Sequence, residues 1–572
     1  MFPQVVKVRS GPRTYEYLRI LESYREGGVS KHRVIANLGR VDKLEGKLDA
    51  LVQSLSKYCR ERLVAPSQVT CDDAVAWGPI LVARHLYDQL GLGQIVRTHC
   101  QGRRDFDVGE TAFVLIANRL TDPRSEHGLA RWLERYYVCD GSGVRWNPAW
   151  LPEERVTKEQ RVRVRSGQLN QWYRTLDALL SAKSEIEKAL YLKVRDLFSL
   201  DVDMVLYDIT STYFERRRPK GELRRHGKSR DGKPRNVQVL LGVVMANGFP
   251  IAHHVFAGNT PDKATFQSTL TDLEDRFGLR RVLVVGDRGF VSEGNLAFLT
   301  EEDREMRYLL GIPGRRCEES AAVLDRVREE AWKTVDDTNR VQEVTLETPN
   351  VRYFVVESQE RKAYEQEQRE RSMELVAEAL GKVEAAVKRG NPKRPVKIAA
   401  RAERAICRNH GKRYYSYDIP GPGAFHFYLD PDKLHAETRR EGIYIIKTND
   451  MTLTPKQSVG LYKQLSDVEW AYRDLKDVIR MRPIYHRRDD RIQAHLLVAT
   501  LALFLKRTLE HQLDAKNLYL TPTEAFAALH SMGISVLDFN GQTKHLTSGG
   551  GRDARRVLKA LDITQLSPLG TD

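Results

Sequence analysis

The chain has few cysteines, and they form no recognisable pattern. Six cysteines are scattered over 572 residues. No two of them stand in the C-x-x-C spacing that is typical of zinc sites and of redox-active pairs. The sequence therefore predicts neither a zinc site nor a disulfide framework.

Long apolar runs are also absent. No run of 18 apolar residues occurs, and the longest apolar stretch, Leu496 to Leu505, is too short to span a bilayer. That stretch predicts a core helix instead. The first residues, Met1 to Gln4, lack the basic start and apolar block of a secretory signal. We therefore expect a cytoplasmic protein without a membrane partner.

Positive charge is present in excess. The chain has 92 Lys and Arg residues against 77 Asp and Glu, which gives a formal charge of +15 and a pI near 9.4. The length predicts several domains, and the apolar fraction of 41% is sufficient for hydrophobic cores. A positive field favours a polyanionic partner, although charge alone does not choose between DNA, RNA and an anionic membrane.

Two carboxylates follow apolar segments that are rich in β-formers. Asp208 follows the run MVLY, and Asp287 follows VLVVG. Both runs predict buried strands. The predicted elements after the first strand are strands over Val237 to Met245 and Pro250 to Phe256, a helix near Asp262 to Phe277, the Asp287 strand, and a strand over Tyr308 to Ile312. Because side chains at the ends of central strands meet at one edge of a mixed sheet, we expect Asp208 and Asp287 to lie close together.

A helix predicted over Pro455 to Ile479 offers a third carboxylate. Tyr462, Glu469 and Lys476 recur on it at seven-residue steps. Seven residues at ~100° each return to within about 20° of the start, so the three side chains share one face. Arg473, four residues after Glu469, joins that face. The alternative interpretation is a solvated helix face with a Glu–Arg pair.

Three converging carboxylates repel one another unless cations neutralise them. Asp208, Asp287 and Glu469 therefore predict a site for divalent cations. Two Mg²⁺ ions in such a site bind a phosphodiester, activate water or a 3′-hydroxyl, and stabilise the leaving oxygen. Mg²⁺ suits this chemistry because it accepts few carboxylates together with phosphate oxygens and water. Mn²⁺ is the expected substitute.

These segments together resemble a known family. Tyr462-x2-Leu465-x3-Glu469-x6-Lys476 is similar to the Tyr-Arg-Glu-Lys signature of bacterial insertion-sequence transposases of the DDE type, in the IS-four superfamily. The long-chain IS-sixteen-thirty-four type is the closer likeness. The supporting blocks are YDITSTYFE (207–215), FAGNTPD (256–262), GDRGFVSEGNL (286–296), VEWAYRDLK (468–476) and RPIYHRRDDRIQAHLLVATLAL (482–503). The resemblance covers about residues 200–512, and a weaker similarity covers residues 15–28.

The resemblance implies an α/β architecture with a ribonuclease H-like catalytic core, and an insertion between the last core strand and the catalytic helix. It implies Asp208, Asp287 and Glu469 as the catalytic, metal-binding carboxylates. Enzymes of this family cut at transposon ends and join the freed 3′-hydroxyl to target DNA. The implied partners are double-stranded DNA, as transposon ends and as target, and a second copy of the chain in the DNA complex.

The resemblance also implies roles for side chains beside the catalytic Glu469. Tyr462 and Lys476 would contact phosphates near the cleaved end. Leu465 stands where the signature has Arg, so one expected phosphate contact is missing. Arg473 lies on the same helix face and is expected to replace that contact.

The densest basic stretch runs from Arg216 to Arg235, directly after the Asp208 strand. Its composition is too polar to pack, which predicts a mobile arm or loop. Contact with the DNA backbone is the functional interpretation, and a solvated loop is the alternative. The candidate DNA-binding residues here are Arg216, Arg217, Arg218, Lys220, Arg224, Arg225 and Lys228.

The expected organisation has six parts. Residues 1–70 predict a β-hairpin, from Tyr15 to Arg25 and Val29 to Leu38, followed by a helix. Residues 71–200 are mainly helical, and we expect them to recognise transposon ends, with a helical scaffold or dimer surface as the alternative. The core takes residues 201–312 and, with the catalytic helix, 441–512; the insertion takes 313–440 and a C-terminal region 513–572.

Two other functions stay open. A domesticated DNA-binding protein would have an inactive core, and the intact Asp208, Asp287 and Glu469 argue against it. A structure-specific nuclease of the same fold would cut DNA without joining it. Among competing acids, Asp262 is the strongest, and its position before Lys263 predicts a helix cap.

Overall fold

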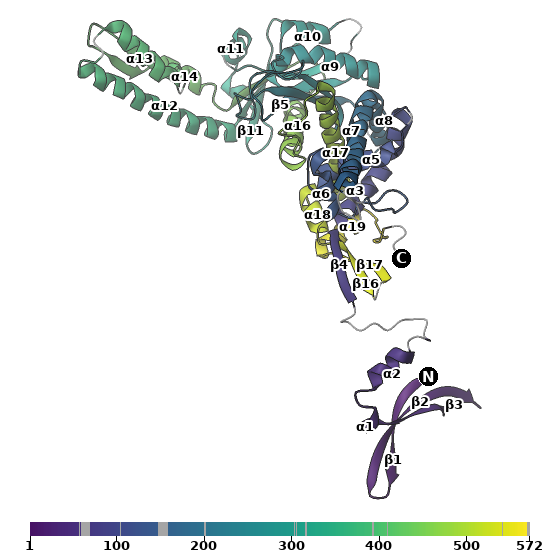
Figure 1. Cartoon of the computed structure of the whole chain (residues 1–572). Coiled ribbons are helices and arrows are strands. Elements are labelled where there is room, and N and C mark those ends of the chain that lie inside the picture. Colours follow the sequence, from purple (N-terminus) through teal and green to yellow (C-terminus); the bar gives the residue numbers. More distant parts are fainter. Residues whose placement is uncertain are drawn as a thin grey trace. The chain divides into compact units, whose positions relative to one another are not determined.

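The structure is a computed structural model that describes residues 1–55, 58, 69–102, 104–146, 158–198, 202–301, 304, 306–314, 317–391, 394–408, 410–539 and 542–568. The chain forms two compact units (Figure 1). The smaller unit contains Met1–Ala74 and Ser535–Leu546. The larger unit contains Val75–Ile534 and Thr547–Thr571.

The smaller unit begins with a three-stranded antiparallel sheet in the order β1-β2-β3 (Phe2–Ser10, Arg13–Glu26 and Val29–Arg40). The predicted hairpin is confirmed as β2 and β3, and Gly27 and Gly28 in its turn have φ of 61° and 81°, which glycine adopts without strain. Strand β1 adds to the hairpin. Two short helices follow, α1 (Val41–Leu44) and α2 (Leu48–Leu55).

A second three-stranded sheet has the order β17-β16-β4. Its strands are Val69–Ala76 (β4), Gly533–Phe539 (β16) and Gln542–Thr547 (β17). Segments that are far apart in the sequence therefore share one sheet.

The larger unit is built on a nine-stranded sheet in the order β10-β11-β12-β15-β9-β8-β5-β6-β7. Its first five strands in the sequence are Met204–Tyr213 (β5), Gln238–Ala246 (β6), Phe249–Ala257 (β7), Leu283–Gly286 (β8) and Arg307–Ile312 (β9). β5, β6 and β7 pair antiparallel, whereas β8 pairs parallel with both β5 and β9. This is the arrangement of a ribonuclease H-like core, and it confirms the predicted fold class.

Four later strands extend this sheet beyond β9. They are Lys333–Thr334 (β10), Asn339–Val344 (β11), Arg352–Ser358 (β12) and Ile443–Thr448 (β15). β15 pairs antiparallel with β9 on one side and with β12 on the other. These four strands of the segment between β9 and the Glu469 helix are thus continuous with the core sheet.

The helical part of that segment has a hydrophobic core of its own. It contains α12 (Gln359–Lys388), α13 (Pro395–Arg408), α14 (Pro431–Thr438) and the hairpin of β13 (Tyr415–Asp418) with β14 (His426–Leu429). Val376, Leu380, Ile398 and Ile406 are among the buried residues of this cluster. We refer to residues 359–438 as the helical arm.

Helices cover the core sheet and share its hydrophobic core. The first six are α3 (Gly78–Gln89), α4 (Leu92–His99), α5 (Val108–Thr121), α6 (Leu129–Arg135), α7 (Lys158–Ser181) and α8 (Lys183–Leu197). The others are α9 (Asp262–Phe277), α10 (Glu293–Leu299), α17 (Asp489–Ala515), α18 (Pro522–Leu529) and α19 (Arg552–Ala560). Helix α11 (Glu318–Asp325) instead packs Val323 into a separate small cluster with Val355 and Ile445.

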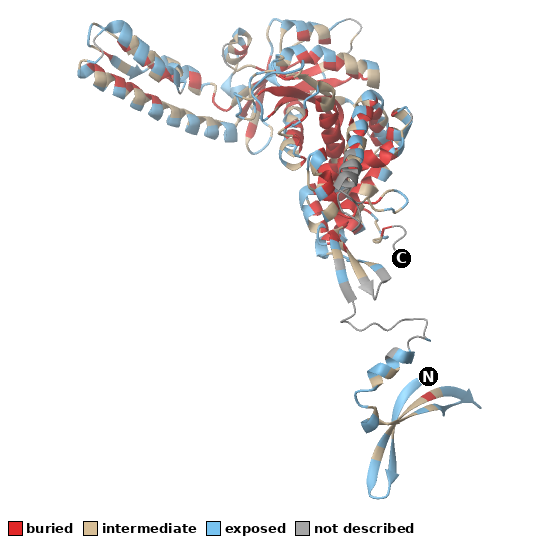
Figure 2. Ribbon diagram, viewed as in Figure 1, coloured by how far each residue is buried: buried red, intermediate tan, exposed pale blue. Residues whose placement is uncertain are grey.

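Helix α17 is the central helix of this core. It contacts α5, α7 and β7, and Figure 2 shows it largely buried. Of the described residues, only α17 forms a helix long and apolar enough to cross a membrane, but 89% of its most apolar window is buried inside the protein. Each fully buried Leu or Val on such a helix contributes about 1.5–3 kcal/mol to folding. The predicted core helix over Leu496 to Leu505 is confirmed.

Candidate active site

Asp208 and Asp287 come from neighbouring parallel strands. In the register of β5 and β8, Tyr207 lies opposite Gly286. Asp208 and Asp287 are the next residues of the two strands, so they lie side by side where β8 ends. Asp208 is half-buried and Asp287 is exposed. The sheet thus brings two of the three predicted carboxylates to one edge.

Glu469 lies on a helical segment that the structure divides into three parts. They are α15 (Pro455–Lys463), α16 (Leu465–Arg473) and the π-helical turn η7 (Asp474–Val478). A capping box between Thr454 and Gln457 begins α15. The prediction of one regular helix is therefore wrong at Gln464 and after Arg473. Glu469 itself is on α16 and exposed.

Tyr472 fixes α16 against the strand that carries Asp208. Its hydroxyl hydrogen-bonds the backbone carbonyl of Asp208, lies 3.2 Å from the carbonyl oxygen of Leu241, and accepts the Val243 N–H at 3.1 Å. The Tyr472 side chain is buried. Because Tyr472 is three residues after Glu469, this contact brings Glu469 to the Asp208 strand.

The charges of Asp287 and Glu469 both act on the Asp208 carboxyl. The pKa of Asp208 is raised to about 7, first by burial and then by the charges of Asp287 and Glu469, against the opposing effects of the Ile209 N–H and the charge of Arg230. A carboxylate cluster of this kind is the donor set that hard divalent cations prefer. The residues present therefore fit a metal centre.

The hydroxyl of Tyr472 offers a test of this arrangement. We expect Tyr472→Phe to lower DNA cleavage by about ten- to a hundredfold, because small displacements of catalytic groups cost about that much. The metal concentration for half-maximal cleavage should rise in parallel, since Glu469 would no longer be held beside Asp208. A metal titration of the cleavage rate measures both effects.

The control is Tyr519→Phe, because the Tyr519 side chain is 86% exposed. It should leave the rate and the metal titration unchanged. If Tyr472→Phe only lowered the unfolding temperature and left the metal titration of the folded enzyme unchanged, Tyr472 would have no positioning role.

Tyr462 lies beside Asp287 in a cavity of about 620 Å³. Its ring stacks on Tyr444 with centroids 5.7 Å apart, and a Cβ at position 311 would collide with its hydroxyl, so Gly311 permits this approach. Burial and the charge of Asp287 raise the pKa of Tyr462, so the hydroxyl keeps its proton and can donate a hydrogen bond. The cations that line the cavity are Arg288, Arg361, Arg413 and Arg440.

Lys476 is engaged by a carboxylate that the sequence analysis missed. Its ammonium lies 2.8 Å from Asp231 Oδ1, which also accepts from Arg482 at 2.5 Å. Asp231 is 1% exposed at its side chain. An acid inside a basic stretch was the signal in the sequence that could have identified it. Lys476 therefore contacts the loop after β5. The π-helical turn that contains Lys476 changes its angular position relative to Glu469 from that of a regular helix.

Arg230, the neighbour of Asp231, also lies at the site. It donates to Asp262 Oδ2 at 2.7 Å, and its charge lowers the pKa of Asp208. The predicted capping role of Asp262 is wrong, because Pro261 is the N-cap of α9 and no side chain caps it. The carboxylate of Asp262 pairs with Arg230 instead.

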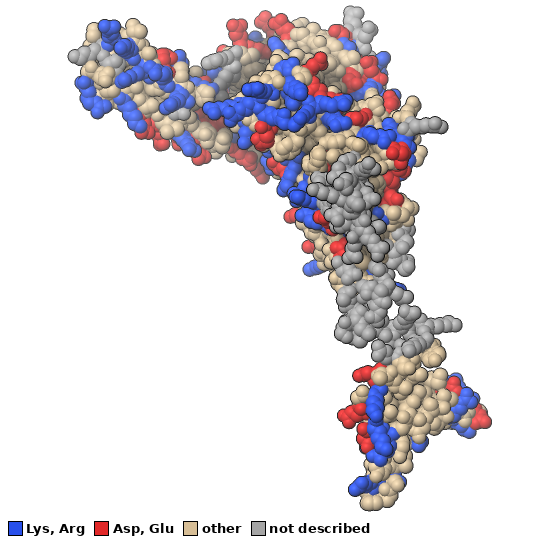
Figure 3. Space-filling view, viewed as in Figure 1, with Lys and Arg blue, Asp and Glu red and all other residues tan. Residues whose placement is uncertain are grey.

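The basic stretch is a packed loop and not a mobile arm. Asp489 accepts backbone N–H bonds from Glu222 at 2.5 Å and Leu223 at 3.3 Å, which anchor the loop to α17. Figure 3 shows Lys and Arg side chains gathered in a band over the part of the molecule that holds the nine-stranded sheet. The exposed predicted contacts in this loop are Arg216, Arg217, Arg218, Lys220 and Lys228.

Arg224 is a correction to the predicted DNA contacts. It is 1% exposed, its guanidinium donates to the backbone carbonyls of Lys220 at 3.0 Å and Arg487 at 2.7 Å, and it lies over the Phe214 ring. Because Arg224 is buried and bonded within the protein, it is not available to contact DNA. Arg225 is half-buried and donates to the carbonyl oxygen of Gly221 at 2.8 Å.

Arg473 is exposed, and its guanidinium lies over the Trp470 ring, 4.2 Å from the centroid. Trp470 is itself 53% exposed. Arg473 thus has no carboxylate partner among the described residues and remains available to a phosphate. Its replacement of the signature Arg stays a prediction.

A second group of possible metal ligands lies elsewhere in the core. Glu126, His486 and His495 are buried with ligand atoms within 4.8 Å of one another. Both ring nitrogens of His495 are engaged, by Arg119 at 3.2 Å and by the Met481 carbonyl at 3.0 Å. The Arg119 guanidinium also lies 4.0 Å from Glu126. This arrangement is a buried polar network that fits a metal poorly.

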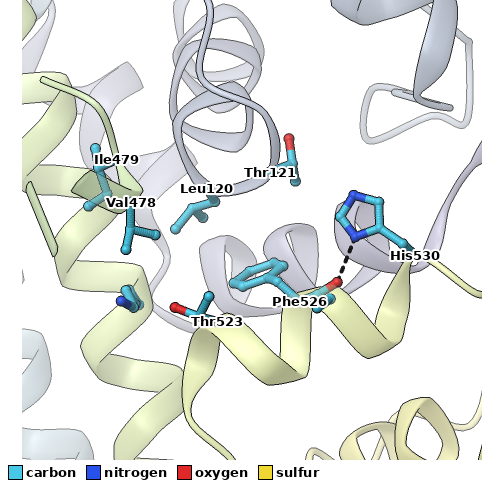
Figure 4. A pocket seen from close by; sticks show the side chains of 9 residues that line it. Leu120, Thr121, Val478, Ile479, Thr523, Phe526 and His530 are labelled. Carbon is cyan, nitrogen blue, oxygen red and sulfur yellow. Dashed lines mark hydrogen bonds between the residues drawn. The ribbon is translucent and has the colours of Figure 1, made fainter. Parts of the chain in front are cut away.

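A smaller cavity, of about 390 Å³, lies between Leu120, Val478 and Phe526 (Figure 4). Its lining is largely apolar and includes Lys506, whose ammonium pairs with Asp474. None of the three carboxylates lines it. The cavity therefore belongs to the helical core and not to the carboxylate site.

The chain is similar to known proteins over most of its length. The family "Transposase DDE domain" matches residues 203–505, more than half of the chain. The family "IS1634 family transposase, N-terminal domain" matches residues 4–68. No curated protein matches. A solved structure of a piggyBac transposase synaptic complex with hairpin DNA has a TM-score of 0.36 and 9% identity, covering 79% of each chain.

Proposed function

This chain belongs to the transposases with a DDE domain, and we propose that it cuts DNA at insertion-sequence ends and joins the freed 3′-hydroxyl to target DNA, by cut and paste. The observation that carries this proposal is the arrangement of Asp208 and Asp287 on the neighbouring parallel strands β5 and β8, with α16, which carries Glu469, held against the Asp208 strand by Tyr472. A DNA-binding protein with an inactive core has no need of such a costly cluster.

In this proposal, Asp208, Asp287 and Glu469 hold two Mg²⁺ ions, or Mn²⁺ as a substitute. When bound, such a pair supplies an activated nucleophile and stabilises the leaving oxygen. Tyr472 keeps Glu469 beside Asp208 through its bond to the Asp208 carbonyl. The raised pKa of Asp208 means that this carboxyl must lose its proton before it can act as a ligand.

Tyr462 and Lys476 are the proposed contacts to phosphates near the cut. Tyr462 keeps its proton and donates one hydrogen bond, while Lys476 supplies a point charge. Lys476 can leave Asp231 without exposing an unpaired acid, since Arg482 also pairs with Asp231. Arg473 and the exposed cations of the loop after β5 would add contacts to the DNA backbone.

The partners follow from this reaction. Double-stranded DNA, as transposon end and as target, is the substrate, and we propose a homodimer in the DNA complex because two ends must be cut and joined together. Residues 71–200 remain the proposed site of end recognition, although their helices also share the core of the catalytic sheet. The proposed location is the cytoplasm.

The test uses the whole protein, a duplex that carries the element's own end, and a plasmid target with Mg²⁺. We expect nicked or cut ends and covalent products in which the end is joined to the plasmid. Cutting without joining would indicate the structure-specific nuclease. End binding with neither cutting nor joining would indicate the inactive, domesticated protein.

A further inference from the structure

Helix α13 of the helical arm has one buried face. Ile398, Ala402 and Ile406 are each at most 2% exposed and pack into the core of the arm. These positions recur at four-residue steps, which place them on one side of a helix. The opposite side of α13 faces solvent.

That solvent face carries cations in a regular stripe. Lys397, Arg401, Arg404 and Arg408 follow one another at steps of four, three and four residues, and all are exposed. At ~100° per residue they lie within an arc of about 60°, with a rise of about 4.5–6 Å between neighbours. We call these four residues the α13 ridge. The surface of the arm over α13 carries many Lys and Arg side chains (Figure 3).

The ridge lacks carboxylate partners, unlike most of the cations of neighbouring α12. On α12, Lys382 pairs with Glu378 at 2.5 Å and Lys388 with Glu384 at 3.3 Å. No carboxylate of the described residues lies within ion-pair distance of the ridge cations. The single acid of α13, Glu403, pairs with Lys412 at 2.6 Å.

The stability of α13 does not explain the ridge. Like charges three and four residues apart repel one another on a helix. Two of the ridge cations donate to backbone carbonyls, Arg401 to Asn391 at 3.1 Å and Arg404 to Ala400 at 3.0 Å. These bonds leave the charges uncompensated, so the ridge presents a surplus of positive charge to solvent.

We propose that the α13 ridge binds the phosphate backbone of duplex DNA. The inference rests on the proposed function, which supplies DNA as the partner, and it assigns a DNA contact outside the carboxylate site and outside the loop after β5. The ridge consists of Lys and Arg alone, which match phosphates in charge. We therefore expect it to add affinity without reading sequence.

The experiment compares two triple variants of the whole protein that remove the same charge. The ridge variant is K397Q/R401Q/R404Q. The matched control is K382Q/K388Q/K412Q, which removes three cations of the arm that already have carboxylate partners. Both are titrated with an end duplex and with an unrelated duplex of equal length, over a series of salt concentrations.

For the ridge variant, we expect the slope of log K against log salt to become shallower by about 2.7, at ~0.9 for each phosphate that is no longer neutralised. Its affinity should fall by about tenfold or more for both duplexes alike. The control should keep the wild-type slope. A charge-keeping variant, R401K/R404K, should also keep it, and its behaviour separates the removal of charge from altered folding.

A ridge variant with the same slope as the control would overturn the proposal. A weakening limited to the end duplex would also overturn it, because it would mean that the ridge reads bases. Failure of the proposed function has a different signature. In that case wild-type protein would neither cut nor join ends, whatever the ridge variant does to binding.

Discussion

Replacing Asp287 with Ala is expected to lower cleavage of transposon ends by about a thousandfold or more. Metal coordination supplies several kcal/mol of transition-state stabilisation, and each ~1.36 kcal/mol corresponds to a factor of ten in rate. Asp287 is exposed at the end of β8, so its removal should not disturb the core. A gel assay of end cleavage measures the rate.

Binding of the end duplex by Asp287→Ala should remain near wild type, since the proposed DNA contacts are other residues. The matched control is Asp275→Ala, which removes an exposed acid from α9. That control should cut at the wild-type rate. Full activity of Asp287→Ala would remove Asp287 from the site and with it the three-carboxylate assignment.

The core elements could be predicted because their signals are local. β8 is a short apolar run that leads into Asp287 as predicted, and α9 was predicted with the same bounds as the structure, Asp262–Phe277. β5 was also recognised, but it continues past Asp208 to Tyr213, so the prediction that Asp208 follows its strand is wrong. A buried strand needs no distant residue to be recognised in the sequence. The order of these elements then determined the ribonuclease H-like sheet.

The loop after β5 was mispredicted because contacts with distant residues fix its conformation, and its composition does not show those contacts. Ten Lys and Arg residues between 216 and 235 suggested a mobile arm. The anchors are instead Asp489, which caps the loop backbone, and the ion pair of Asp231 with Lys476. The partners in each of these contacts lie more than 200 residues apart in the chain, and no composition rule connects them.

The helical segment that carries Glu469 could also be predicted only in part. Its start and its carboxylate could be read from the sequence, whereas the π-helical turn at Asp474–Val478 could not. Asp474 in that turn pairs with Lys506 on α17. A wider turn is a local departure from helical spacing at a tertiary contact, so a rule of ~100° per residue placed Lys476 only approximately.

Replacing Asp208 with Asn is expected to abolish cleavage and at the same time to stabilise the metal-free protein at pH 8. Folding raises the pKa of Asp208 to about 7, through burial first and then through Asp287 and Glu469. A carboxyl with a raised folded-state pKa favours folding most fully at low pH, and that contribution declines as the pH rises towards 7. Above that pH the charged Asp208 destabilises the fold, and Asn relieves this cost.

The unfolding temperature in EDTA at pH 5 and at pH 8 measures the effect. At pH 8 the variant should unfold at a higher temperature than wild type, by a few degrees if the gain is about 1 kcal/mol. At pH 5 the difference should be smaller than at pH 8, because the wild-type carboxyl is then still neutral in the folded protein and ionised only in the unfolded chain. Adding Mg²⁺ at pH 8 should stabilise wild type far more than the variant, because a ligand that binds only the folded state raises its stability. An equal difference at both pH values would mean that Asp208 is not held in a charge-disfavouring site, and the need for a cation between Asp208, Asp287 and Glu469 would lose its physical basis.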